Sequence, residues 1–184
     1  MLTIVVPGRE LYNEQTNEFF TIQETTLKLE HSLVSISKWE AKYKKPFISK
    51  TKKDTKTREE TLDYIRFMTL TQNVDPNVYY GLSDENIKAI ADYIDDPMTA
   101  SWVSDEDDKK SKSNEAITSE LIYWWMTALQ IPWEAQKWHL NRLMMLIRIG
   151  NKKNQPPKKM SRNQILARNK RLNDERRRKY NTKG

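Results

Sequence analysis

The chain has 184 residues and a formal net charge of +7, from 32 Lys and Arg against 25 Asp and Glu. It has no cysteine and two histidines, which excludes a disulfide framework, a thiolate zinc site and a cysteine nucleophile. No apolar run approaches the ~20 residues that span a bilayer, and the N-terminus lacks the basic start of a signal peptide. We therefore expect a soluble intracellular protein with no cofactor; composition alone does not indicate its function.

The positive charge is concentrated at one end of the chain. Residues 151–184 hold 13 Lys and Arg against two acids, a net charge of +11, whereas the other 150 residues carry 19 basic and 23 acidic side chains, a net charge of −4. This asymmetry is typical of a tail that binds a polyanion or an acidic protein surface. A solvated tail that only aids solubility is the alternative.

The first 30 residues have the pattern of short strands. Residues 2–6 are rich in β-branched side chains and stop at Pro7-Gly8, a turn signal, and residues 19–22 and 26–29 are two further candidates. They predict a small hairpin or meander of three strands, which needs helices to cover its apolar face.

Helix-capping signals follow along the chain. Ser32 precedes a predicted helix that Pro46 ends, Thr57 or Thr61 opens the next, and Asp75-Pro76 begins a short turn that stops at Gly81. Ser83 opens another helix. Its predicted buried stripe is Ile87, Ile90, Ala91 and Ile94. The polar stretches 44–58 and 104–114 are expected to be surface loops.

The densest apolar region lies between Ile117 and Ile149, and Pro132 divides it into two predicted helices. Because both are apolar over more than half of their circumference, we expect them to pair at the centre of the core. Four tryptophans fall at helical core positions, where burial is favoured over a base-stacking role: Trp124, Trp125, Trp133 and Trp138. Three methionines either fill this core, the simpler account, or line an adaptable groove: Met126, Met144 and Met145.

After Gly150 a polar linker with Pro156-Pro157 leads to a capping-box pattern at Ser161 and Gln164. A helix over 162–180 is predicted, although its only large aliphatic side chains are Ile165, Leu166 and Leu172. A helix that polar is not stable by itself and would become ordered on a partner. The predicted fold is thus α+β, mostly α: a globular domain over 1–150, β-rich at 1–30 and helical at 31–150, and a basic linker with a C-terminal helical tail over 151–184.

The sequence contains no recognisable catalytic motif. The four glycines are isolated, so there is no Gly-rich phosphate loop. His31 cannot form a triad with its direct neighbours, and His139 is predicted to be a core histidine bonded to a backbone carbonyl. Asp95-Asp96, ahead of Pro97, fits a turn better than a metal site. We therefore predict no enzymatic activity, no catalytic residue and no metal or cofactor site.

The candidate functional residues are consequently those that could bind a partner. Trp39 and Trp102 are the tryptophans expected to be more exposed, and the tail supplies the others. The full set is Trp39, Trp102, Lys158, Lys159, Arg162, Ile165, Leu166, Arg168, Leu172, Arg176, Arg177, Arg178 and Lys179.

Several segments resemble small tail-gene proteins of siphophages. They are Ile131 to Leu143, Leu29 to Glu40, Met68 to Asn73, Asp96 to Ala100 and the basic end from Pro156 to Asn169. The chain is similar in this respect to the tail assembly chaperones encoded between the major tail protein and the tape measure protein. Its predicted N-terminal strands depart from an all-helical family pattern.

The resemblance implies a protein that coats the long helical tape measure protein, keeps it soluble and recruits tail-tube subunits in the cytoplasm of a bacterial host. It implies protein partners. Homo-oligomers are possible, and no membrane is expected because no apolar run is long enough to span a bilayer. A structural tail or neck component is one alternative, and an accessory protein that binds nucleic acid through Arg176-Arg177-Arg178-Lys179 is another.

Overall fold

The computed structural model describes residues 1–13, 17–48, 56–101, 116–154 and 161–181. It is an α+β fold, mostly helical, in which an N-terminal β-hairpin is followed by helices, as the sequence predicts. The chain divides into two compact units, Met1–Lys152 and Lys153–Gly184. The helices of the first unit are α1 (Leu33–Tyr43), α2 (Arg58–Met68), the 3₁₀ helix η1 (Pro76–Gly81), α3 (Asp84–Asp95), α4 (Ser119–Ala128), the 3₁₀ helix η3 (Trp133–Lys137) and α5 (Leu140–Asn154).

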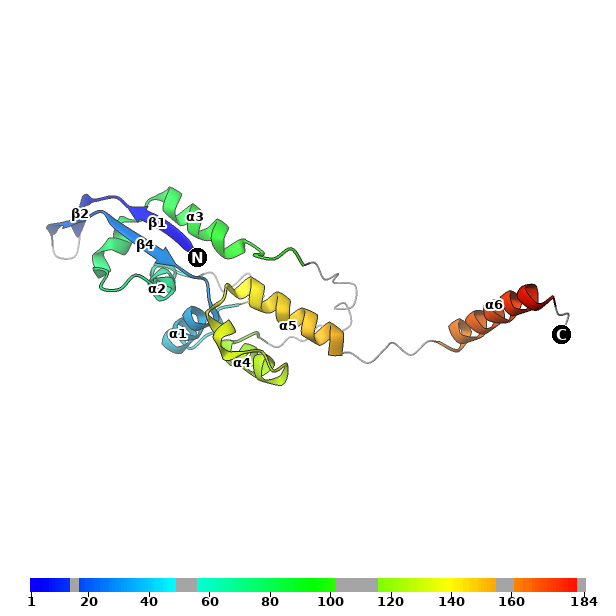
Figure 1. Ribbon diagram of the computed structural model, residues 1–184. Helices are drawn as coiled ribbons and strands as arrows, with labels where there is room; N and C mark the ends of the chain where they lie inside the picture. The colour runs from blue at the N-terminus through cyan, green and yellow to red at the C-terminus, as the bar shows by residue number, and fades with distance from the viewer. Residues whose placement is uncertain (14–16, 49–55, 102–115, 155–160, 182–184) are drawn as a thin grey trace. The chain divides into compact units, whose positions relative to one another are not determined.

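The N-terminal hairpin consists of two antiparallel strand pairs. Strand β1 (Leu2–Val6) pairs with β4 (Thr25–Leu29), and β2 (Arg9–Asn13) pairs with β3 (Glu18–Ile22). Figure 1 shows β1 and β4 side by side, with β2 toward the tip of the hairpin and α3 alongside β1. The predicted three-strand arrangement is therefore incomplete, because the polar segment that forms β2 becomes a strand by pairing with β3.

Alternation along β1 and β4 explains how the hairpin joins the core. Ile4, Val6, Leu27 and Leu29 are buried on one face, whereas Val5 between them is 50% exposed. Successive side chains of a strand point to opposite faces, so one face of this strand pair packs on the helices and the other faces solvent.

The predicted helix starts are confirmed. The side chains of Ser32, Thr57 and Ser83 each accept a hydrogen bond from the backbone N–H three residues later, and Asp75 accepts one from the N–H of Asn77 ahead of η1. Each cap satisfies an N–H group that has no partner within its helix. Local sequence thus fixes where these helices begin.

The buried stripe of α3 differs from the predicted one. Ile90 and Tyr93 are buried, but Ile87 is 37% exposed and Ala91 is also exposed. The amide of Asn86 donates to the carbonyl of Val5 in β1 at 3.1 Å. The helix therefore turns its Asn86–Ile90–Tyr93 side toward the core, and Ile87 toward solvent.

The apolar region before and after Pro132 is also arranged differently from the prediction. The second helix is interrupted: η3 ends at Lys137, and α5 starts at Leu140 and continues through Gly150 to Asn154. The two α-helices supply fully or almost fully buried core side chains, as expected. These are Ile122, Met126, Leu143 and Ile147.

A buried carboxylate joins α1 and α2. Asp63 on α2 accepts hydrogen bonds from Lys42 and, at 2.6 Å, from the hydroxyl of Tyr43, and it pairs with Arg66 at 2.8 Å. Burial disfavours the charge of Asp63, but these three hydrogen bonds outweigh burial and hold its pKa below the usual value.

Candidate partner-binding surfaces

The second unit contains the helix predicted from the basic tail, α6 (Arg162–Tyr180). The Ser161 side chain accepts from the N–H of Gln164, and the Gln164 side chain accepts from the N–H of Ser161, so the predicted capping box is confirmed. No residue of α6 is buried. Its eight Lys and Arg against two acids give it a net charge of +6.

Helical geometry places two apolar and four cationic side chains on one side of α6. At about 100° per residue, Ile165 and Leu172 fall on one side of the helix, where both are about as exposed as each other, 44% and 40%. Four cations share this arc of about 120°: Arg162, Arg168, Arg176 and Lys179. These six residues are called the basic apolar face below.

The two acids of α6 lie off the basic apolar face. Asp174 is on the opposite side of the helix, and Glu175, at the edge of the face, pairs with Arg171 at 3.2 Å. The face is therefore cationic and apolar without an intervening carboxylate. Such a surface complements one that is acidic and apolar.

The remaining tail candidates are distributed differently. Leu166, 58% exposed, and Arg177 flank the basic apolar face, whereas Arg178 projects from the other side of the helix. Lys158 and Lys159 lie outside the described residues, and so does Trp102.

Trp39 is not a surface anchor, and this prediction is wrong. Its side chain is fully buried, its indole Nε1 donates to the carbonyl of Glu60 at 2.9 Å, and the ring of Phe47 packs edge-on against it at 5.1 Å. Because its polar atom and its ring are both satisfied inside the protein, Trp39 is a core residue that joins α1 to α2.

The prediction that the tryptophans around Pro132 are core residues is also wrong for three of the four. Trp124 is 64% exposed, Trp133 is 54% exposed and Trp138 is 37% exposed, whereas Trp125 is half-buried. One signal for this exposure was present in the sequence, because Trp124 shares a helix face with Glu120 and Thr127. No such signal was present for Trp133 and Trp138. Their exposure follows from the interruption of the helix between Trp133 and Leu140, which the sequence does not predict.

Neighbouring side chains contact two of these exposed rings, those of Trp133 and Trp138. Tyr123 lies 5.2 Å from Trp133, centroid to centroid, and its hydroxyl donates to the amide oxygen of Gln136 at 3.1 Å. The guanidinium of Arg142 lies 4.8 Å from the ring centroid of Trp138, a cation–π distance. Trp133 and Trp138 thus each have a neighbouring side chain against one part of the ring although they are exposed.

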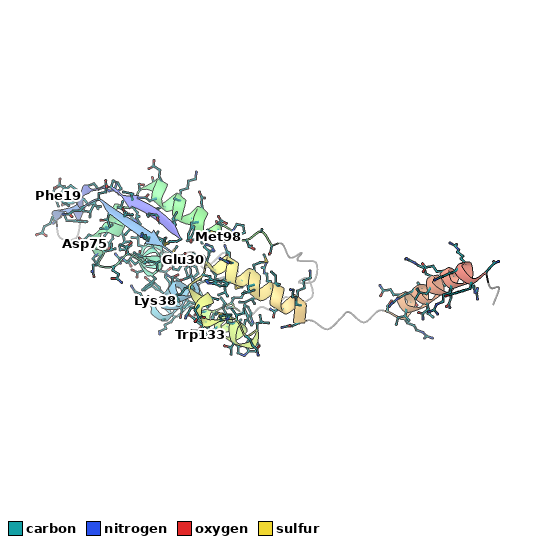
Figure 2. The ribbon with its side chains drawn as sticks, in the orientation of Figure 1. Phe19, Glu30, Lys38, Asp75, Met98 and Trp133 are labelled. Atoms are coloured by element: carbon teal, nitrogen blue, oxygen red, sulfur yellow. The ribbon has the colours of Figure 1, made fainter. Side chains whose placement is uncertain are left out.

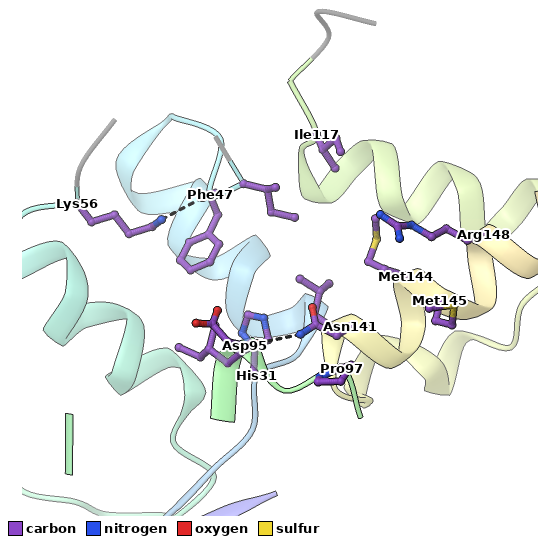
Figure 3. Close-up of a pocket in the computed structure, with 13 residues that line it drawn as sticks. His31, Phe47, Lys56, Asp95, Pro97, Ile117, Asn141, Met144, Met145 and Arg148 are labelled. Carbon is purple, nitrogen blue, oxygen red and sulfur yellow. Dashed lines mark hydrogen bonds between the residues drawn. The ribbon is translucent and has the colours of Figure 1, made fainter. Parts of the chain in front are cut away.

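A cavity of about 570 Å³ opens between the segment that follows α1, the end of α3 and α5 (Figure 3). Its lining is largely apolar, with Phe47, Met144 and Met145 among it, and Lys56, Asp95 and Arg148 add charge. Met126, by contrast, is fully buried. Of the three methionines in the predicted groove, one therefore fills the core and two line this cavity.

Both histidines lie in the core. His139 Nδ1 accepts from the N–H of Asn141 at 3.3 Å, so Nε2 carries the proton and donates to the carbonyl of Tyr93 at 2.9 Å, as predicted for a core histidine. His31 Nδ1 shares a 2.5 Å hydrogen bond with the hydroxyl of Tyr64. Burial, with the nearby His139 contributing, lowers the pKa of His31 to about 3.

Among the residues that the structure describes, no group of three or more His, Asp or Glu side chains is placed to hold a metal ion. Within those same ranges, no helix is both long enough and apolar enough to cross a bilayer. The chain matches no protein-family model, no curated protein and no solved structure.

Proposed function

We propose that this protein is a non-catalytic assembly factor that binds an acidic, apolar protein surface through α6. The observation that carries the proposal is the basic apolar face, in which Ile165 and Leu172 are aligned with four cations and are not buried within the second unit. Combined with the resemblance to siphophage tail assembly chaperones, it favours the tape measure protein as the partner, with recruitment of tail-tube protein, in the cytoplasm of a bacterial host.

The composition of the face favours a protein partner over nucleic acid. Phosphate binding needs cations, but it does not need Ile165 and Leu172 to lie in line with them. An amphipathic helix that binds a groove or a second helix presents anchors at this i, i+7 spacing. The consecutive cations Arg176 to Lys179 point in four directions around α6, so only two of them belong to the face.

The positions of the two histidines support a protein without catalysis. His139 uses both ring nitrogens in hydrogen bonds to the backbone, and His31 is held by Tyr64 with a pKa of about 3. A general base that operates near neutral pH needs a pKa close to that pH and access to a substrate. Neither histidine is therefore a good candidate for a general base. An assembly factor does not need a general base.

Co-expression tests the proposed function. The long helical protein encoded beside a tail assembly chaperone should remain soluble when this chain is co-expressed with it and should precipitate alone. Copurification of the two proteins should weaken as salt rises, because four cations of the face contribute to binding. Equal precipitation with and without this chain would contradict the proposal.

Binding to nucleic acid is the second candidate, favoured by the net charge of +6 on α6. If six or more phosphates were contacted, affinity for duplex DNA or for single-stranded RNA would fall by roughly a thousandfold or more between 50 and 200 mM salt. Replacing Ile165 and Leu172 with Ala would then leave affinity unchanged, whereas it should abolish binding to an apolar protein partner.

A further inference from the structure

The first unit presents an exposed surface on α4 and η3 that combines aromatic and acidic side chains. Trp124 and Glu120 are four residues apart on the same face of α4 and both are exposed, and Trp133 and Glu134 are adjacent exposed residues of η3. Tyr123 supports the ring of Trp133. These four residues, Glu120, Trp124, Trp133 and Glu134, are called the acidic aromatic surface below.

Exposed tryptophans at this density are unusual on a surface that faces only water. Trp is the residue most enriched at the energetic centres of protein interfaces, because it buries a large rigid area at low entropic cost. Trp124 and Trp133 expose more than half of their surface. The acidic aromatic surface therefore has the composition of a binding site for apolar and cationic side chains.

The same chain carries a segment with the complementary chemistry. The basic apolar face of α6 combines Ile165 and Leu172 with Arg162, Arg168, Arg176 and Lys179. We infer that the acidic aromatic surface of one copy binds the basic apolar face of α6 of a second copy. The inference rests on the proposed function in one respect only, namely that this face of α6 is a binding face.

Charge disfavours a contact between the tails of two copies. Two α6 helices, each with a net charge of +6, would repel each other. Opposite charges meet when α6 of one copy binds Glu120 and Glu134 of another. Arginines can also stack on the exposed indoles, as Arg142 does on Trp138 at 4.8 Å within this chain.

The predicted contact joins two different surfaces, so each copy in an array would use its α6 on one neighbour and its tryptophans on the other. Such a heterologous contact forms rings or open chains, and a symmetric dimer is not its product. Association should grow with protein concentration and weaken as salt rises.

Sedimentation equilibrium of the full chain at rising concentration tests the inference. The weight-average mass should increase above the 21.9 kDa of one chain. Two variants should each remain at the mass of one chain: a surface variant, Trp124→Ala with Trp133→Ala, and a tail variant, Ile165→Asp with Leu172→Asp. Because all four side chains are at least 40% exposed, the variants should keep the thermal unfolding transition of the first unit.

Mixing the two variants gives the sharpest outcome. The surface variant keeps an intact α6 and the tail variant keeps intact tryptophans, so their mixture should form a 1:1 dimer of twice the chain mass and nothing larger. The matched control is Tyr12→Ala with Phe19→Ala, which removes a second exposed aromatic pair at the hairpin tip, well away from Trp133 (Figure 2). This control should associate as the wild type does.

A second pair of variants keeps the test valid if removal of Trp133 perturbs η3. Glu120→Lys with Glu134→Lys should abolish association, and mixing this variant with Arg168→Glu and Arg176→Glu should restore it between the two chains. A wild type that stays at one chain mass at every concentration would overturn the inference. So would a surface variant that associates normally, or a mixture that fails to form the dimer.

Failure of this inference is distinguishable from failure of the proposed function. The surface variant should still solubilise the long helical partner, because its α6 is unchanged, whereas the tail variant should not. A monomeric wild type that solubilises the partner through α6 would leave the proposed function standing and overturn only the pairing of copies.

Discussion

The imidazole rings of His31 and His139, the chain's two histidines, lie edge to face in the core with their centroids 5.1 Å apart. His31 is in the link between β4 and α1, and His139 directly precedes α5, whose first N–H, that of Leu140, donates to the carbonyl of His31 at 2.7 Å. Tyr64 from α2 and the carbonyl of Tyr93 from α3 hold the two rings. This contact joins four helices to the hairpin, which is a structural role.

We expect stability to fall in mild acid because His31 is buried without charge. Its pKa is about 3 in the folded state and about 6.5 when unfolded, so the unfolded chain binds more protons at intermediate pH. The contribution of neutral His31 to the free energy of unfolding is fully present above pH 6.5. It is lost as the pH falls toward 3, by up to about 1.4 kcal/mol per pH unit. Urea denaturation at pH 7, 6, 5 and 4.5 measures this slope.

The control for this prediction is His31→Asn, which removes the titrating group. The variant is expected to be less stable at pH 7, since it loses the bond to Tyr64, but its free energy of unfolding should change little between pH 6.5 and 4.5. Carboxylates such as Asp63, whose pKa is lowered, add their own acid sensitivity only below about pH 4. An unchanged slope in His31→Asn would show that another group is responsible.

Truncation of Trp39 should lower the free energy of unfolding much more than truncation of Trp124. Trp39→Ala removes a fully buried ring and its hydrogen bond to Glu60, and should cost about 3–5 kcal/mol of folding free energy. Trp124→Ala removes a ring that is 64% exposed and should change stability by about 0.5 kcal/mol or less. Chemical denaturation of both variants at low protein concentration measures the difference, and equal losses would contradict the burial described for them.

The end of η1 approaches the hairpin too closely for any side chain at Gly81. A Cβ on Gly81 would lie 2.0 Å from the Cδ1 of Ile22 and 3.3 Å from the Cγ1 of Val6. Gly81→Ala should therefore cost about 1–3 kcal/mol, because Ile22 is buried and must move.

A double-mutant cycle tests the proposed cause of that loss. Ile22→Val removes the Cδ1 atom, so Gly81→Ala should cost clearly less in the Ile22→Val background than in the wild type, measured by urea denaturation. Additive losses would mean that the contact with Ile22 does not limit the position of Gly81.

A single buried carboxylate connects α1 with the start of α4. Glu40 accepts from the N–H of Phe47 at 2.8 Å through Oε1 and from the N–H of Ser119 at 2.7 Å through Oε2. Glu40→Gln replaces one acceptor by a donor and should cost about 1–3 kcal/mol, because one N–H loses its partner. Glu24→Gln, at an exposed position, is the control and should change the unfolding free energy by less than about 0.5 kcal/mol.

The parts of the fold that local chemistry determines were predictable from the sequence. Ser32, Thr57, Ser83 and Ser161 begin helices because their side chains satisfy nearby N–H groups, which needs no information from distant residues. The β-branched run of β1 was equally readable. Strand β2 was not, since its conformation depends on pairing with β3.

The surface residues were harder to predict because burial depends on which helix faces meet. Trp39 and Trp124 have the same side chain on amphipathic helices, and only tertiary packing makes one buried and the other exposed. The contact between His31 and His139 joins distant segments and left no local pattern. The basic apolar face of α6 was partly predictable, because charge and the spacing of Ile165 and Leu172 are properties of the sequence.

The central claim, that the basic apolar face of α6 binds a protein partner, is tested most directly by reversing charge on one face of α6 at a time. Arg168→Glu with Arg176→Glu changes the face, whereas Lys170→Glu with Arg178→Glu changes the net charge equally on the other side of the helix. The measurement is the soluble fraction of the co-expressed long helical partner. We predict that the first variant loses the partner to the pellet and the second keeps it soluble; equal effects of the two variants would contradict the claim.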